Sequence, residues 1–371
     1  MLIVTLSYAY KKLARPIFFL FDPEAVHNFV TGLGEVLGEV SELNAIISKM
    51  FSSKSKVLKQ EIAGIEFKSP IGLAAGFDYE AKVVKVLPSL GFGFNSVGTI
   101  TNYPYAGNPK PRLGRLPKSR SLMVYKGFKN RGALATAEKL SNQKFSIPLG
   151  ISIGKSNIPQ INTQKDAILD IVSALKIFEN SNVSNSYYEL NISCPNLFGN
   201  VTFYKPEYLN DLLNETDKLK LNKPIFIKMP IELSNNQTMK LLDIIVRHRV
   251  AGVIIGNLQK NRNDKAFVKD ELKKWKVGNF SGKPTWKRSN ELIGLAYRMY
   301  GNKLTIIGCG GVFSAEDAYT KIKLGASLVQ LITGLIFEGP FLVAEINKDL
   351  PLLLRKDVFK HISEAVGTYE E

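Results

Sequence analysis

Short apolar runs alternate with amphipathic segments along most of this chain. Helical patterns with an apolar stripe occupy, for example, residues 165–179, 235–248 and 315–324. Strand followed by helix, repeated along a chain, indicates a parallel sheet, and eight strands are the number that closes a (β/α)8 TIM barrel. The eight runs with strand character cover residues 70–77, 94–99, 148–154, 187–193, 224–230, 251–257, 304–311 and 327–334.

A doubly wound open sheet is the structural alternative. It is disfavoured because no strand-linked Gly-x-Gly-x-x-Gly motif opens the first helix. In a barrel, ligands bind at the carboxyl ends of the strands, which should otherwise be apolar. Polar residues do gather at the predicted strand ends, and they predict a functional mouth: Asp78, Thr99, Ser152, Asn191, Cys194, Asn196, Lys228 and Asn257.

Two connections on the same rim are longer than ordinary loops. They cover residues 100–130, after the second predicted strand, and 258–288, after the sixth. Long loops at the catalytic end of a barrel are usually lids or binding loops, and we expect that role for both.

The first 50 residues have a different pattern and are predicted to be helical. Apolar runs at 2–9 and 17–21 are separated by Lys11, Lys12 and Arg15, and Asp22-Pro23-Glu24 is typical of a helix start. Apolar clusters broken by cations suit a helix in a membrane interface, or an amphipathic helix packed on the domain. No apolar run reaches the ~18 residues of a membrane span.

Residues 52–56 resemble a linker, so the pattern divides the chain into a helical segment, 1–50, and a barrel domain, 51–371. In the first segment, five apolar side chains are expected to face lipid and the three cations to meet anionic head groups. These apolar residues are Leu2, Ile3, Leu6, Phe18 and Phe19.

Composition limits the classes of partner. The chain has 371 residues, of which 45% are hydrophobic, and a net charge of +16. Such a charge fits nucleic acid, an anionic membrane surface or anionic small molecules, and it also fits an ordinary solvated basic surface. The lysines are scattered without an Arg-rich arm, so we expect no nucleic-acid partner, and we expect no metal site. Two cysteines, Cys194 and Cys309, make no disulfide framework and fit a reducing compartment.

Glycine pairs at the last two predicted strands indicate a phosphate site. Gly310-Gly311 ends the seventh strand and Thr333-Gly334 the eighth, where phosphate sites recur in barrels. Ser281-Gly282 adds a further turn near this rim. Together they predict a phosphate-bearing cofactor, and Lys228 could meet the N1–C2 region of a flavin.

Ordered motifs give the chain a resemblance to a known family. They are "GLAAGFD" (72–78), "GNPKPRLGRLP" (107–117), "ELNISCPN" (189–196), "FSGKP" (280–284), "IIGCGGV" (306–312) and "GASLVQL" (325–331). The chain resembles dihydroorotate dehydrogenase, and "DPEAVH" (22–27) with the helical N-terminus resembles the class 2, quinone-reducing enzymes. The resemblance implies FMN, oxidation of dihydroorotate to orotate in pyrimidine biosynthesis, a membrane quinone as acceptor, and a peripheral position on the cytoplasmic side of the cell membrane.

The resemblance also implies roles for individual residues. Cys194, where class 2 enzymes usually have Ser, would be the general base; a thiol pKa near 8.5 would leave some thiolate at neutral pH. Asn191, Asn196 and Asn257 would bind the pyrimidine, whereas Cys309 would only pack. His27 and Arg115 would lie at the quinone site. The cofactor would contact Ala74, Ala75, Gly76, Thr99, Ser152, Asn191, Lys228, Gly256, Ser281, Gly282, Gly310, Gly311, Thr333 and Gly334.

Several positions depart from the family pattern. Tyr79 replaces the Lys expected after "GFD", and "MVYKGF" places Val124 and Tyr125 where the family has "INRxGF". The other departures are Ser152 for Asn, Leu258 for Thr and Ile332 for Tyr. These departures remove one cation and several polar contacts to substrate or flavin. Either nearby cations take over these contacts, or the substrate is not dihydroorotate. The candidate cations are Lys126, Lys129 and Arg131.

Two other functions fit the same residues. One is a flavin oxidoreductase that acts on another dihydropyrimidine or cyclic amide. The other is a catalytically lapsed flavin-binding protein docked on a membrane.

Overall fold

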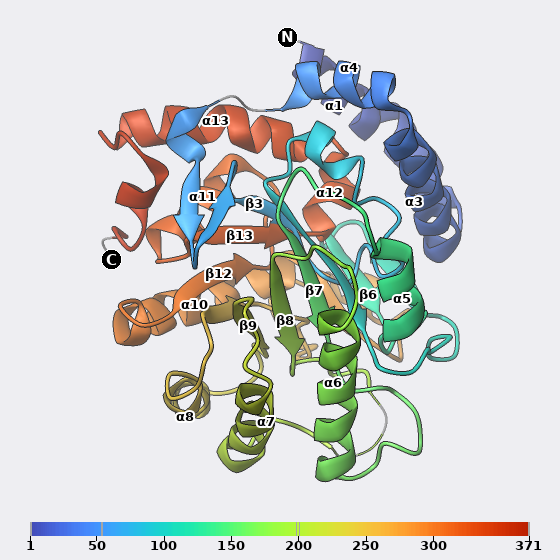
Figure 1. Cartoon of the computed structure of the whole chain (residues 1–371). Coiled ribbons are helices and arrows are strands. Elements are labelled where there is room, and N and C mark those ends of the chain that lie inside the picture. The colour runs from blue at the N-terminus through green and yellow to red at the C-terminus, as the bar shows by residue number, and fades with distance from the viewer. Residues whose placement is uncertain (1, 53–54, 198, 200, 370–371) are drawn as a thin grey trace.

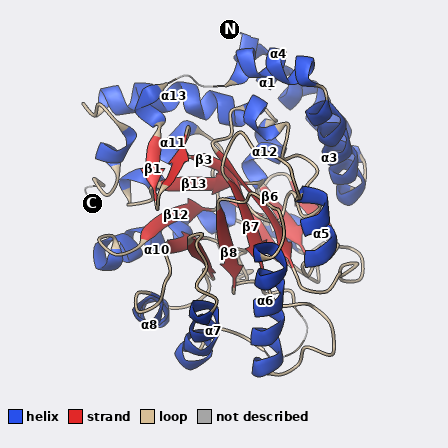
Figure 2. Cartoon of the chain, viewed as in Figure 1, coloured by secondary structure: helices blue, strands red, loops and turns tan. Residues whose placement is uncertain are grey.

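A closed barrel of parallel strands forms the centre of the computed structural model (Figures 1 and 2). The structure describes residues 2–52, 55–197, 199 and 201–369, apart from the side chain of Leu2. Around the barrel the strand order is β10-β12-β13-β3-β4-β7-β8-β9. Their bounds are β3 Ile71–Leu73, β4 Phe94–Ile100, β7 Leu149–Ile153, β8 Tyr187–Asn191, β9 Ile225–Met229, β10 Gly252–Ile255, β12 Thr305–Cys309 and β13 Leu328–Leu331.

This arrangement confirms the predicted (β/α)8 barrel with an N-terminal helical extension. Each predicted strand coincides with an observed one; most observed strands end earlier, whereas β4 runs one residue past its predicted end at Thr99. After β3, for example, the chain leaves the sheet at Ala74, and Gly76 (φ +116°) donates its N–H to the carbonyl of Gly98. The polar and glycine residues therefore lie mostly just beyond the strands, at the barrel mouth.

Helices cover the outside of the barrel and bury its apolar faces (Figure 2). The predicted helices at 165–179, 235–248 and 315–324 are confirmed, with small differences at their ends. The helices are α5 Ala133–Leu140, α6 Gln164–Glu179, α7 Pro206–Lys218, α8 Asn235–Ile245, α9 Lys269–Leu272, α10 Trp286–Tyr300, α11 Ala315–Lys323, α12 Thr333–Glu338 and α13 Leu342–Lys356. Short 3-10 turns occupy Lys56–Leu58, Leu87–Leu90, Lys283–Thr285 and Ile362–Ala365.

The amino end of the barrel is closed. A hairpin of β1 (Gln60–Ile62) and β2 (Ile65–Phe67) brings Phe67 against Phe94, with ring centroids 5.3 Å apart. Both rings belong to a buried cluster that also contains Tyr187 and Phe226. Because aromatic side chains fill this end, a ligand can enter only from the opposite, carboxyl end.

The two long rim connections, expected to be lids or binding loops, join each other in one small sheet. β5 (Leu113–Leu116) and β6 (Ser121–Val124) pair with each other, and β6 pairs with β11 (Asn279–Gly282) in an antiparallel sheet. Alternate residues of β5 and β11 are buried, and Leu116, Met123, Phe267 and Phe280 form a core beneath them. These segments thus form a fixed wall beside the mouth.

The N-terminal segment is helical and runs along one side of the barrel (Figure 1). Its elements are α1 Leu2–Ala9, the π-helix η1 Tyr10–Ala14, α2 Arg15–Leu20, α3 Pro23–Glu39 and α4 Ser41–Phe51. Asp22 caps α3 by accepting a hydrogen bond from the N–H of Ala25, as the sequence pattern predicts. Of the expected linker at 52–56, residues 53 and 54 lie outside the described residues.

Two of the three N-terminal cations bind the barrel instead of standing free for lipid. Lys11 pairs with Glu338 at 3.3 Å, and Arg15 donates to the carbonyl of Phe337 at 2.9 Å. Tyr10 donates to the carbonyl of Ile336 at 2.8 Å. These three contacts fix the segment to α12, whereas Lys12 is exposed. No helix among the described residues has the length and apolar character needed to cross a bilayer.

Candidate active site

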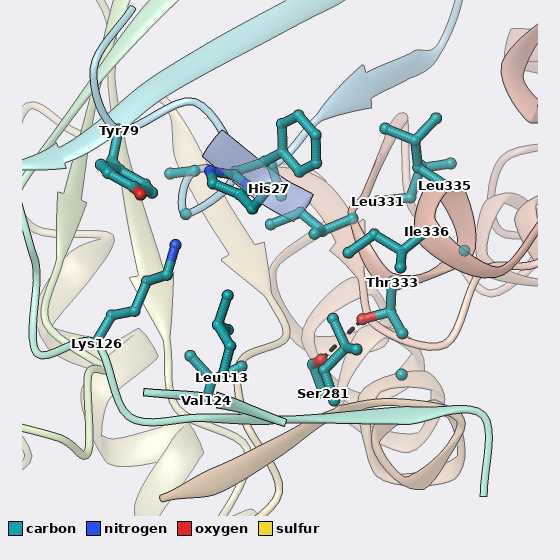
Figure 3. A pocket seen from close by; sticks show the side chains of 18 of the residues that line it. His27, Tyr79, Leu113, Val124, Lys126, Ser281, Leu331, Thr333, Leu335 and Ile336 are labelled. Carbon is teal, nitrogen blue, oxygen red and sulfur yellow. Dashed lines mark hydrogen bonds between the residues drawn. The ribbon is translucent and has the colours of Figure 1, made fainter. Parts of the chain in front are cut away.

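One cavity of about 530 Å³ begins at the carboxyl ends of the strands and reaches residues of α2 and α3. Figure 3 shows part of its lining. Almost all the predicted site residues line it, although they come from nearly the whole length of the chain. They are His27, Ala74, Ala75, Gly76, Thr99, Arg115, Asn191, Cys194, Asn196, Lys228, Gly256, Asn257, Ser281, Gly282, Gly310, Gly311, Thr333 and Gly334.

Two residues expected at the mouth lie behind it. Ser152 is fully buried within β7, and its hydroxyl contacts that of Thr99 at 3.1 Å, so it supports a lining residue rather than lining the cavity. Asp78 accepts hydrogen bonds from the N–H groups of Lys82 and Val83. Burial raises the pKa of Asp78 to about 6, although those two N–H groups oppose the shift. Asp78 thus fixes a turn of the backbone.

Two asparagines hold the loop that carries Cys194. Asn257 donates from Nδ2 to both the carbonyl oxygen and the hydroxyl of Ser193, each at 2.6 Å. The Ser193 hydroxyl donates to Oδ1 of Asn191 at 2.9 Å, and Asn191 donates to Thr99 Oγ1 at 2.8 Å. β4, β8 and β10 therefore meet at this loop, which presents Cys194 to the cavity.

Asn196 joins the same loop to the small rim sheet. Its Nδ2 donates to the carbonyl of Val124 at 3.0 Å, and its Oδ1 accepts from Asn279 Nδ2 at 2.8 Å. Its backbone carbonyl accepts from Asn108 Nδ2 at 3.0 Å. The three predicted amides thus lie around one end of the cavity, each held by hydrogen bonds from a different part of the fold.

The environment of Cys194 makes the thiolate fraction at neutral pH much smaller than an ordinary thiol pKa near 8.5 predicts. Burial raises the pKa of the Cys194 thiol to about 12, although the N–H of Asn196 and the charges of Lys228 and Lys260 lower it. With that pKa only roughly one thiol in 10⁵ is ionised at pH 7. Burial also raises the pKa of Cys309. Cys309 lines the cavity as well, beside the glycines that follow β12.

The opposite side of the cavity is built from glycine backbone and hydroxyl groups. The hydroxyls of Ser281 and Thr333 are 2.8 Å apart (Figure 3). Gly310 and Gly311 have φ values of +108° and +71°, a region that favours glycine. A Cβ on Gly311 would come within 2.5 Å of Cβ of Trp286, so packing as well as backbone conformation requires glycine there.

The far end of the cavity is apolar and is lined by the N-terminal helices. Residues Val26, Val30, Leu33 and Leu37 of α3 line it at helical spacing, a stripe that the sequence shows but that we did not assign to the site. Phe18 and Phe19 also line it, which corrects their expected contact with lipid. The Phe19 ring packs edge-on against Phe337, with centroids 5.5 Å apart.

His27 and Arg115 lie where this apolar end meets the barrel. The His27 ring stacks on Tyr79 with centroids 5.3 Å apart, and burial, with Lys126, Lys129 and Lys82 nearby, lowers its pKa to about 2. His27 is therefore neutral. Arg115 donates to the carbonyl of Phe21 at 2.7 Å, and its guanidinium lies 4.7 Å from the Phe19 ring centroid.

Comparison with known proteins decides the family. The family model for dihydroorotate dehydrogenase matches residues 57–354. The chain belongs to this family. Curated relatives named dihydroorotate dehydrogenase (quinone) include one from Christiangramia forsetii, 37% identical, with 92% of this chain and 98% of that protein covered. Another, from Gloeobacter violaceus, is 35% identical over 96% of this chain and 98% of that protein.

Solved structures agree with this assignment. DHODH from Eimeria tenella superposes with a TM-score of 0.81 in its ligand-free form, at 26% identity over 94% of this chain and 99% of that chain. The same enzyme in complex with ferulenol also gives 0.81, at 24% identity over 98% of each chain. These matches confirm the barrel fold and the family resemblance read from the sequence.

Dihydroorotate dehydrogenases carry a lysine where this chain has Tyr79, and three nearby cations could replace it. The structure shows that these three differ in position and in partners. Arg131 is exposed and does not line the cavity. Lys129 lines it but pairs with Glu24 at 3.0 Å. Lys126 lines the cavity, is 8% exposed, and has its ammonium 4.1 Å from the centroid of the Tyr79 ring.

Proposed function

We propose that this chain oxidises dihydroorotate to orotate in pyrimidine biosynthesis and passes the electrons to a quinone. One observation carries the proposal: a single cavity connects the Cys194 loop and its three asparagines with an apolar end between the N-terminal helices. A polar end suits a pyrimidine, and an apolar end suits a quinone. The relatives in the family comparison are named for the same reaction.

The residues present fit FMN, the cofactor of this family. The cavity volume of about 530 Å³ lies within the range typical of cofactor sites. Gly310, Gly311, Thr333, Gly334 and Ser281 would hold the phosphate, because they offer bare backbone and hydroxyl groups. When bound, the flavin supplies the hydride acceptor.

Lys228 would hold the flavin ring at its N1–C2 edge. Its side chain is 4% exposed, and among the described residues its ammonium has no hydrogen-bond or ion-pair partner. A buried cation needs a compensating negative group, and the reduced flavin is anionic. Ala74, Ala75, Gly76, Thr99, Asn191 and Gly256 would surround the ring.

The amides and the thiol would act on the pyrimidine. Beyond their hydrogen bonds within the protein, Asn191 keeps one amide N–H, Asn196 keeps an N–H and a lone pair, and Asn257 keeps its Oδ1. Together they offer the donors and acceptors that the alternating N–H and C=O edge of the ring requires. Cys194 would remove the proton from C5, beside the ring carbonyl, as C6 loses its hydride. Since the thiol is neutral in the ligand-free protein, the reaction should accelerate as pH rises.

The N-terminal segment would dock peripherally on the cytoplasmic face of the cell membrane. It carries more than half of the large exposed hydrophobic side chains of the described chain. A concentration of exposed apolar side chains supports contact with a membrane. Those outside the cavity lining include Leu13, Ile17, Leu20, Phe21, Val36 and Ile46. In this arrangement the apolar end of the cavity, His27 and Arg115 would receive quinone from the bilayer.

Turnover of the purified full-length protein tests the proposal. Orotate should form from dihydroorotate with a short-chain quinone or a dye as acceptor, and the protein should contain about one FMN per chain. A flavin-containing protein that oxidises dihydrouracil but not dihydroorotate would instead support the reading as another dihydropyrimidine oxidoreductase. Flavin without turnover of either compound would indicate a catalytically lapsed protein.

A further inference from the structure

The ammonium of Lys126 is an unused positive charge inside the cavity. Its side chain is 8% exposed, and among the described residues it has no hydrogen-bond or ion-pair partner. Burial lowers the pKa of Lys126 to about 7. The positive charges of Lys129 and Arg112 also lower this pKa, whereas the negative charges of Glu24 and Glu80 raise it. A buried charge without a partner is costly, so this position favours an anionic ligand.

The ammonium is held over an aromatic ring that is itself fixed. Tyr79 is 4% exposed; the Lys126 ammonium lies 4.1 Å from its ring centroid, and the His27 ring stacks on it with an interplanar angle of 14°. Cation–π contact stabilises an ammonium but leaves its N–H groups free to donate to a ligand. Lys126 is thus positioned and still available.

The backbone of Lys126 adjoins the pyrimidine end of the cavity, and its side chain reaches from there to the Tyr79 ring. The carbonyl of Lys126 accepts from the N–H of Asn108 at 3.2 Å, and Nδ2 of Asn108 donates to the carbonyl of Asn196 at 3.0 Å. In Figure 3, Lys126 and Tyr79 lie on one side of the pocket, and the Ser281–Thr333 pair lies on the other. The cofactor phosphate is proposed for the latter side, so the anion at Lys126 is a different group.

We propose that Lys126 binds the carboxylate of the substrate and sets the specificity for a carboxylated pyrimidine. This inference rests on the proposed function, which makes dihydroorotate the substrate. The Lys126 ammonium, on the same side of the cavity as Tyr79, would take the place of the cation that the family carries after "GFD", and the Tyr79 ring supports it. Lys129 and Arg112 lie nearby, but both are already paired with Glu24.

Ligand binding to the flavin-loaded protein tests this inference, with flavin absorbance as the readout. Lys126→Met should weaken orotate binding roughly 10- to 100-fold, the range expected for loss of a hydrogen bond between ionised groups. Affinity for uracil, which lacks the carboxylate, should change less than about threefold. Arg131→Met removes one positive charge from the same loop outside the cavity and is the matched control.

Moving the cation back provides a rescue. Tyr79→Lys in the Lys126→Met background should recover part of the orotate affinity, because it restores an ammonium to the same end of the cavity. Flavin content shows whether each variant has folded, and Lys126→Gln is the neutral replacement to use if Lys126→Met does not retain flavin.

Three outcomes decide the matter. Orotate affinity that stays at the parent level in Lys126→Met, or that falls together with uracil affinity, would overturn the role of Lys126 alone. If Lys126→Met loses flavin, parent-level orotate affinity in Lys126→Gln with flavin retained would have the same meaning. A parent protein that neither binds orotate nor oxidises dihydroorotate would overturn the proposed function, and this inference with it.

Discussion

Asn257 and Ser193 are joined by two hydrogen bonds of 2.6 Å, although 64 residues separate them in the chain. Asn257 follows β10, whereas Ser193 precedes Cys194 in the loop after β8. The amide therefore fixes the position of the thiol and does not merely line the same cavity.

Replacing Asn257 should disturb catalysis by releasing this loop. We expect Asn257→Ala to lower kcat/KM for dihydroorotate roughly 10- to 100-fold, because a partly buried donor to two oxygens is lost. Asn257→Asp should be worse, since a carboxylate would face the Ser193 carbonyl. Steady-state kinetics at constant flavin content would measure kcat/KM for both variants. If Asn257→Asp were as active as its parent, Asn257 would have no role in positioning the Cys194 loop.

Cys194 carries the proposed proton transfer. Cys194→Ala should slow flavin reduction by dihydroorotate roughly 10²- to 10⁴-fold, the usual contribution of a general base, while flavin stays bound. Cys309→Ser is the matched control and should have little effect. Stopped-flow absorbance would measure the rates, and an unimpaired Cys194→Ala protein would show that the thiol only packs.

The pH dependence follows from the raised pKa of this thiol. Burial holds the pKa of Cys194 at about 12, so the base form is scarce at pH 7 and grows as pH rises. The rate of flavin reduction at saturating dihydroorotate should therefore rise about tenfold per pH unit between roughly pH 7 and 9. Cys194→Ser should react more slowly throughout. A flat profile in the parent protein would argue that another group takes the proton.

Exposed apolar residues of the N-terminal segment should control membrane contact. Leu13, Ile17 and Leu20 are 66%, 55% and 84% exposed, and none lines the cavity. Changing all three to Glu should reduce co-sedimentation with anionic vesicles several-fold, because charged groups are excluded from the apolar interface. Dye-linked turnover should stay near the parent value. Undiminished vesicle binding would place the membrane contact elsewhere.

Glu24 ties α3 to the barrel and should contribute to stability. It is 6% exposed and contacts Arg112 at 2.9 Å and Lys129 at 3.0 Å. Burial alone would raise the pKa of Glu24, but Lys129 and then Arg112 lower it below its ordinary value. We expect Glu24→Gln to lower the free energy of unfolding by about 1–3 kcal/mol at pH 7, because two cations lose their partner.

The pH dependence of that loss is a check on its cause. A carboxylate with a lowered folded-state pKa stabilises fully above its unfolded pKa, near 4.3, and this stabilisation disappears as pH falls through the folded value. The difference between parent and Glu24→Gln in urea unfolding should therefore shrink on acidification. A difference that persists at pH 3 would indicate lost packing instead of lost charge.

The sequence by itself determined the barrel and most of its mouth. Eight apolar runs between helices leave few alternatives, since parallel strands must be buried on both faces. Glycines and amides at the strand ends could be assigned because the fold brings every such end to one rim. Local sequence patterns were enough to assign these residues to the mouth, because the place of a residue in the strand–helix repeat determines where it lies in the barrel.

Tertiary structure decided the direction of individual side chains and the environment of each charge. Phe18 and Phe19 have the same apolar character as Leu20, yet they face the cavity while Leu20 faces outward. Pairing of β11 with β6 joins two loops that the sequence separates. The pKa of Cys194 and the free ammonium of Lys126 depend on burial and on neighbours from distant segments, which no local pattern encodes.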